Sequence, residues 1–123
     1  MTALNMFWGF VLGACLGSFL TCAAWRLPQR TSLGGRSICP ACRSPLRARW
    51  NVPVAGWVAL RGRAGCCDAR IPARYVLIEA AVAVIWAALA AGAGVLMALA
   101  AMLAVVVAVV VVSKVTERHP PPA

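Results

Sequence analysis

Acidic residues are scarce in this sequence. Only three carboxylates, Asp68, Glu79 and Glu117, stand against twelve Lys and Arg residues in 123 positions. Hydrophobic residues make up 63% of the chain, and charged residues only 12%. A soluble domain of this size carries more charge and less apolar surface, so the composition excludes an ordinary soluble domain and indicates a membrane protein.

The positive charge is concentrated in one segment. Residues 26–75 hold ten of the twelve basic residues, all of them arginines: Arg26, Arg30, Arg36, Arg43, Arg47, Arg49, Arg61, Arg63, Arg70 and Arg74. Short basic loops between membrane spans stay on the cytoplasmic side, so this placement predicts a cytoplasmic loop. We therefore expect the lipid bilayer, with its anionic headgroups, as the partner of these charges, and no nucleic acid.

Six cysteines occur, and four of them lie in pairs within this loop: Cys39, Cys42, Cys66 and Cys67. Cytosolic thiols are reduced, so paired cysteines there predict metal ligands before disulfides. Two residues between Cys39 and Cys42 let both sulfurs reach one ion, whereas the adjacent Cys66 and Cys67 need an unusual turn, which Gly65 can supply. We predict one zinc ion on these four cysteines. Three sulfurs with a weaker ligand, and a site that no longer binds metal, remain alternatives.

The apolar segments predict the membrane architecture. Residues 1–25 form the first transmembrane helix, and the absence of a basic stretch before it favours a retained anchor with its N-terminus outside. Gly9, Gly13 and Gly17 share one helix face, which favours close packing against the chain's own helices over dimerisation. Residues 76–112 are too long for one span, and Gly92-Ala93-Gly94 predicts a turn that makes them a transmembrane helical hairpin.

The predicted fold is therefore an all-α membrane protein. It has three transmembrane helices, with a cytoplasmic zinc-ribbon-like Cys loop at residues 26–75 between the first and second and a short cytoplasmic tail at residues 113–123. Glu79 is the one charge inside the hairpin, and we expect its side chain to snorkel toward Arg74 or Arg26. Tryptophans are assigned to the membrane interface or to packing: Trp8, Trp25, Trp57 and Trp86.

Several motifs in series resemble one family. Gly17-Ser18-Phe19-Leu20 and Trp25-Arg26-Leu27-Pro28 resemble the GSFLN…YRLP opening of bacterial type IV prepilin peptidases, the leader peptidases. Cys39-Pro40-Ala41-Cys42 resembles their CPxC, and residues 50–57 and 61–79 resemble the stretches that follow it. The resemblance covers residues 13–80 and implies their N-terminal domain. It further implies a cytoplasmic zinc loop, the bacterial inner membrane, and a link to type IV pili and type II secretion.

The departures from the family pattern are specific. The third family cysteine falls on Ala64, and Cys66 is an off-register extra that can take over its ligand position. The family's proteolysis uses two aspartates, one of them in a GxGD motif, because two carboxyl groups must share a proton. No GxGD occurs in the sequence, and Ser113 falls at the position of the other aspartate. We therefore assign no catalytic residue and expect no proteolysis by this chain alone.

Three functions stay open on these grounds. The leading one is a stand-alone prepilin peptidase N-terminal domain, accessory to or derived from type IV prepilin processing. Its expected partners are a separately encoded catalytic half or a pilin-like precursor. The alternatives are a membrane-anchored zinc-binding interaction scaffold and a residual prepilin N-methyltransferase. The sequence has no Gly-rich turn between a strand and a helix that would bind S-adenosylmethionine, so the methyltransferase role rests on the resemblance alone.

Overall fold

The computed structural model describes residues 1–118, and every regular element in that range is a helix. Three long helices, α1 (Thr2–Arg26), α3 (Arg74–Ala93) and α4 (Val95–Arg118), frame a loop that contains the short helices η1 (Ala48–Trp50) and α2 (Ala55–Ala59). No strand forms within these residues. The all-α class is thus confirmed. The predicted tail at residues 113–123 begins within α4, and residues 119–123 lie outside the described part.

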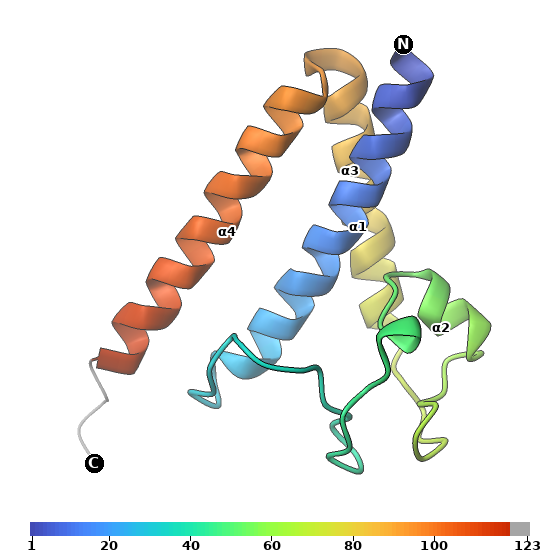
Figure 1. Ribbon diagram of the computed structural model, residues 1–123, viewed down its shortest axis with the longest axis vertical. Helices are drawn as coiled ribbons and strands as arrows, with labels where there is room; N and C mark the ends of the chain where they lie inside the picture. Colours follow the sequence, from blue (N-terminus) through green and yellow to red (C-terminus); the bar gives the residue numbers. More distant parts are fainter. Residues whose placement is uncertain (119–123) are drawn as a thin grey trace.

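Helices α1 and α3 pack closely and antiparallel (Figure 1). A Cβ atom on Gly13 would lie 2.6 Å from Cβ of Trp86 and 2.8 Å from Cα of Ala83, too close for any side chain. Gly9 and Gly17 meet α3 in the same way, one turn to either side. The glycine face therefore packs against the chain's own helix, which confirms that prediction.

A tight turn joins α3 to α4. Gly94 has a φ of 86°, a conformation that glycine adopts without strain, and it ends α3. Beyond the turn, the indole Nε1 of Trp86 donates a hydrogen bond of 3.0 Å to the carbonyl of Ala98. This bond ties the first turn of α4 to α3, and α4 then leans away from α1 toward its C-terminal end (Figure 1).

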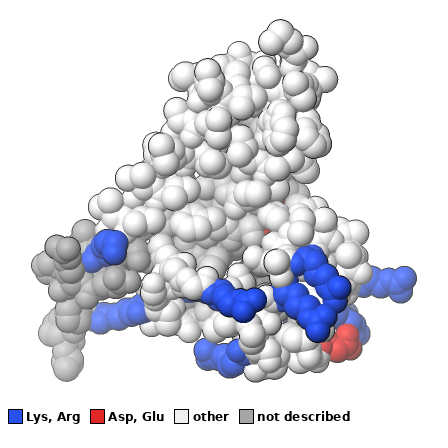
Figure 2. Space-filling model, in the orientation of Figure 1, with Lys and Arg blue, Asp and Glu red and all other residues white. Residues whose placement is uncertain are grey.

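Two of the helices, α1 and α3, are long and apolar enough to cross a membrane, while α4 carries a shorter apolar stretch, Val95–Val111. Large apolar side chains point outward on all three, among them Leu4, Phe7, Leu77, Leu96 and Leu103. Figure 2 shows the basic side chains gathered at the lower end of the molecule, around the loop and the C-terminal end of α4, with none higher up on the visible face of the helical part. An apolar helical body with one basic end is typical of a membrane protein.

Candidate metal centre

Arg26 connects α1 to the loop. Its side chain is only 7% exposed, and its guanidinium donates hydrogen bonds to the carbonyls of Ser32 (2.9 Å), Gly34 (2.7 Å) and Arg36 (3.0 Å). A buried guanidinium must have its donors satisfied, and backbone carbonyls supply the acceptors here. This residue, which the sequence placed among the basic residues of the loop, therefore fixes the path of the next ten residues of the chain.

The first Cys turn comprises residues 38–45. The N–H of Cys39 donates to the carbonyl of Ser44 (2.9 Å), and the N–H of Arg43 donates to the carbonyl of Cys39 (2.9 Å). An isolated antiparallel bridge pairs Ile38 with Pro45 and closes the turn. Arg43 adopts a φ of 60°, which reverses the chain.

The second Cys turn, residues 63–70, repeats this geometry. The N–H of Ala64 donates to the carbonyl of Ala69 (2.8 Å), and the N–H of Asp68 donates to the carbonyl of Ala64 (2.8 Å). The bridge pairs Arg63 with Arg70, and Asp68 takes the φ of 60°. Each bond joins positions 25 residues beyond those of the first turn, so the two turns are structural copies.

The matching bonds pair each residue of the second turn with the residue 25 positions before it in the first turn, and this pairing shows which cysteine is displaced. Cys67 stands where Cys42 stands in the first turn, and Ala64 stands at the position of Cys39. Cys66 has no cysteine counterpart, because Ala41 occupies its place in the first turn. The duplication therefore shows that the second turn carries its extra thiol two positions downstream of the regular ligand position.

The four loop thiols nevertheless come together, and all four Sγ atoms lie within 4.8 Å of one another. The Sγ atoms of Cys39 and Cys67 are 3.8 Å apart, those of Cys42 and Cys66 3.3 Å, and those of Cys66 and Cys67 3.9 Å. Zn–S bonds of ~2.3 Å in a tetrahedron place sulfurs ~3.8 Å apart. The cluster thus has the ligand number, chemistry and spacing to hold one metal ion.

The surroundings of the cluster give two of its thiols very different pKa values. Hydrogen bonds from the hydroxyl and backbone of Ser44, supplemented by the Cys66 thiol, lower the pKa of Cys42 to about 6. The neighbouring Cys42 raises the pKa of Cys66 to about 12. Thiolates are the metal-binding form of cysteine. At neutral pH Cys42 is therefore already in the form that could bind a metal ion, whereas Cys66 would have to lose its proton to do so.

Two tryptophans support the second Cys turn. The indole ring of Trp50 covers Gly65, where a Cβ atom would lie 2.7 Å from the ring, and Trp57 covers Gly62 in the same way. The Nε1 of Trp57 also donates a hydrogen bond of 3.2 Å to the carbonyl of Ile71. Of the two roles expected for Trp57, packing within the loop is the one found. No packing role was predicted for Trp50, because the glycine that it covers lies fifteen residues away in sequence.

Glu79 joins the loop to α3 in an unexpected manner. Its Oε2 accepts a hydrogen bond of 2.8 Å from the N–H of Val54, not from Arg74 or Arg26 as the sequence led us to expect. Val54 has φ 61° and ψ −55°, and the N–H of Ala55 donates to the carbonyl of Pro53 (2.6 Å). These values describe a classic γ-turn, which is strained for a β-branched residue. The carboxylate holds this strained backbone in place.

The remaining candidate residues stay apart from the cluster. Cys15 and Cys22 lie within α1, and the Asp68 carboxylate forms an exposed ion pair with Arg63 at 3.0 Å. Asp68 and Glu79 therefore serve different parts of the loop and do not form a carboxylate pair.

Comparison with known proteins places the chain. The family described as Bacterial Peptidase A24 N-terminal domain matches residues 11–93. The prepilin leader peptidase/N-methyltransferase of Myxococcus xanthus is 44% identical over 71 residues, which is 57% of this chain and 21% of the relative. Its counterpart in Dickeya chrysanthemi is 39% identical over 93 residues, 56% of this chain and 33% of that protein.

A third relative, the prepilin leader peptidase/N-methyltransferase of Burkholderia pseudomallei strain 1026b, is 39% identical over 118 residues, 75% of this chain and 37% of the relative. The chain thus spans between about a fifth and somewhat over a third of the length of these relatives and corresponds to their N-terminal part. No solved structure matches it significantly. With its motifs in family order and its match over residues 11–93, the chain belongs to the bacterial peptidase A24 N-terminal domain family.

Proposed function

We propose that this chain is a membrane-embedded N-terminal domain of the prepilin leader peptidase type, whose loop holds one zinc ion on Cys39, Cys42, Cys66 and Cys67. The observation that carries the proposal is the cluster of four thiols on two matching turns, with spacings that suit a tetrahedral Zn–S site. Bound zinc would cross-link the two turns and stabilise a loop that has little apolar core of its own.

The membrane arrangement proposed is three spans in the bacterial inner membrane. Residues 1–25 would cross first, and residues 76–112 would return as a hairpin that includes the apolar part of α4. The loop at residues 26–75 would be cytoplasmic and the N-terminus outside, with residues 113–123 as a cytoplasmic tail. The arginines gathered at the loop end of the molecule support this orientation (Figure 2).

The activity proposed is an accessory role in the processing of pilin-like precursors. It is supported by the name that the relatives share, prepilin leader peptidase/N-methyltransferase, and by the match of residues 11–93 to the Bacterial Peptidase A24 N-terminal domain. We propose that the carboxylate pair needed for proteolysis comes from a catalytic half outside residues 1–123, such as a separately encoded one. Among the described side chains, the Asp68 carboxylate is paired with Arg63 and the Glu79 carboxylate is bonded to Val54, so these two do not form such a pair.

The proposal is tested by co-expressing the full chain with a pilin-type precursor, with and without a candidate partner that carries a GxGD motif. We expect cleavage only when the partner is present, and less cleavage when this chain is omitted. Cleavage by this chain alone would overturn the claim that it lacks proteolytic activity. Cleavage by the partner at the same rate without this chain would overturn the accessory role. Methylation of a pilin-type peptide by the purified chain would instead support the methyltransferase alternative.

A further inference from the structure

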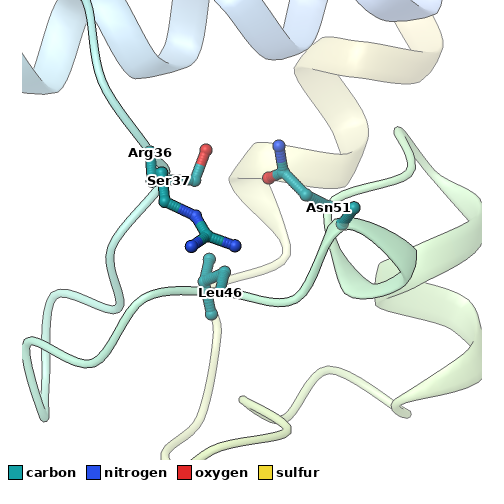
Figure 3. A pocket seen from close by; sticks show the side chains of 5 residues that line it. Arg36, Ser37, Leu46 and Asn51 are labelled. Atoms are coloured by element: carbon teal, nitrogen blue, oxygen red, sulfur yellow. The ribbon is translucent and has the colours of Figure 1, made fainter.

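A small cavity, open to solvent, lies in the loop, away from the thiol cluster. It has a volume of about 190 Å³ and is lined by Arg36, Ser37, Leu46, Ala48 and Asn51. Figure 3 shows the guanidinium of Arg36 and the amide of Asn51 entering this space from opposite sides, with Leu46 below. Sites that enclose a drug-sized ligand measure ~300–1,000 Å³, so this cavity suits a single small polar group.

Both walls of the cavity are held by the backbone. The carbonyl of Arg36 accepts a hydrogen bond from the buried Arg26, and the carbonyl of Ser37 accepts one from the N–H of Leu46 (2.8 Å). On the other side, the N–H of Asn51 donates to the carbonyl of Ala48 (3.0 Å). The backbone that carries these polar side chains is therefore fixed before any ligand arrives, which lowers part of the entropic cost of binding.

The charge in and around the cavity is positive. Among residues with described side chains, the one ion pair is between Arg63 and Asp68, and the Glu79 carboxylate is bonded to Val54. Arg47 and Arg49 are the sequence neighbours of the lining residue Ala48, and their guanidinium carbons lie 5.1 Å and 5.4 Å from the ring centre of Trp50. No described carboxylate neutralises Arg36, so the cavity favours an anion.

We infer that this cavity binds a phosphate group. A guanidinium presents paired N–H donors to two phosphate oxygens, and an amide and a hydroxyl can bond the others. The guanidinium of Arg26, the last residue of α1, donates a hydrogen bond of 3.0 Å to the carbonyl of the lining residue Arg36. In the membrane arrangement proposed above, the cavity therefore lies near the level of lipid phosphates. The phosphate can belong to an anionic lipid headgroup or to a soluble phosphate, and the position at the end of α1 favours the lipid.

The test uses the full chain purified in detergent with its metal. Native mass spectrometry follows binding of short-chain phosphatidylglycerol and, in parallel, of inorganic phosphate. Loss of a charge-assisted hydrogen bond predicts that Arg36→Gln weakens lipid binding by roughly tenfold or more, and that Asn51→Ala weakens it several-fold. Arg70→Gln is the matched control, because it removes the same charge from the second Cys turn, outside the cavity. We expect it to change binding less than about twofold.

The outcomes separate the hypotheses. Equal losses of lipid binding in Arg36→Gln and Arg70→Gln would show that lipid is held by the general positive charge of the loop, and would overturn the proposed site. Absence of binding of both probes would also overturn it. Binding of inorganic phosphate as tight as that of lipid, with the same dependence on Arg36, supports the phosphate site and overturns the lipid source. Metal content is measured on each variant. A variant that loses metal is judged unfolded in the loop, and its lipid binding is not used. The lipid binding of Asn51→Ala and Ser37→Ala then decides whether the cavity is the binding site. A wild type without metal counts against the zinc proposal alone.

Discussion

The duplicated Cys turns predict that the displaced ligand can be returned to its regular position. In Cys66→Ser the cluster loses one of four sulfurs. Structural zinc sites contribute ~10–16 kcal/mol in all, so one thiolate accounts for roughly 2–4 kcal/mol, or about 30- to 1,000-fold in zinc affinity. Adding Ala64→Cys restores a thiol at the position equivalent to Cys39, on a turn with the same backbone hydrogen bonds. We expect the double variant to bind zinc within about tenfold of the wild type.

The assay is competition with a chromophoric zinc chelator on the purified, reduced full chain. Cys15→Ser is the matched control, since it removes a thiol from α1 and should leave the affinity unchanged. Cobalt substitution adds a second readout, because the intensity of thiolate-to-cobalt absorption reports the number of sulfur ligands. If the double variant binds zinc no better than Cys66→Ser, the equivalence of the two turns does not extend to metal binding and the reasoning fails.

Three further predictions concern the packing of α1 on α3, the contact of Glu79 with Val54, and the acidity of two loop thiols. Gly13→Ala should destabilise the helix pair by about 1–3 kcal/mol, because its Cβ meets Trp86 and Ala83. Gly92→Ala, which has open space, should be neutral or stabilising by up to ~1 kcal/mol. Thermal unfolding in detergent compares the two, and equal Tm values would contradict the packing. Glu79→Ala should cost roughly 1.5–3 kcal/mol, and Val54→Gly in that background should recover part of it by relieving about 1–3 kcal/mol of strain. Hydrogen exchange of the loop amides measures both the loss and the recovery. Unchanged exchange in Glu79→Ala would refute the claim that the Glu79 carboxylate stabilises the loop. In the metal-free chain at pH 7.5, iodoacetamide should modify Cys42, with its pKa of about 6, well before Cys66, with its pKa of about 12. Cys42 modification should slow as the pH falls through about 6, and mass spectrometry showing Cys66 modified first would contradict the assignment.

The helical body could be predicted from the sequence because its signals are local and repetitive. Long apolar runs and the spacing of Gly9, Gly13 and Gly17 identify membrane helices and a close-packing face without knowledge of the partner. The cysteine spacing likewise predicted which four thiols come together. Each of these inferences needs only the periodicity of one element or a known ligand geometry.

Contacts between distant loop positions could not be predicted in the same way. The short helices η1 and α2 span three and five residues, less than a periodic pattern can reveal. Glu79 bonds to a backbone N–H 25 residues earlier, and backbone donors leave no trace in the sequence. Arg26 similarly binds three carbonyls rather than a charged partner. The duplication of the Cys turns is carried by hydrogen bonds and by the positive φ angles of Arg43 and Asp68, where the two segments share little sequence.

The central claim is that one metal ion cross-links the loop through four thiols, with Cys66 two positions downstream of the position equivalent to Cys39. Elemental analysis of the purified, reduced wild-type chain, beside Cys39→Ser and Cys67→Ser, tests it most directly. The account predicts about one zinc ion per wild-type chain and a clear loss in both variants. A wild-type content far below one metal per chain, or an unchanged content in the variants, would contradict it.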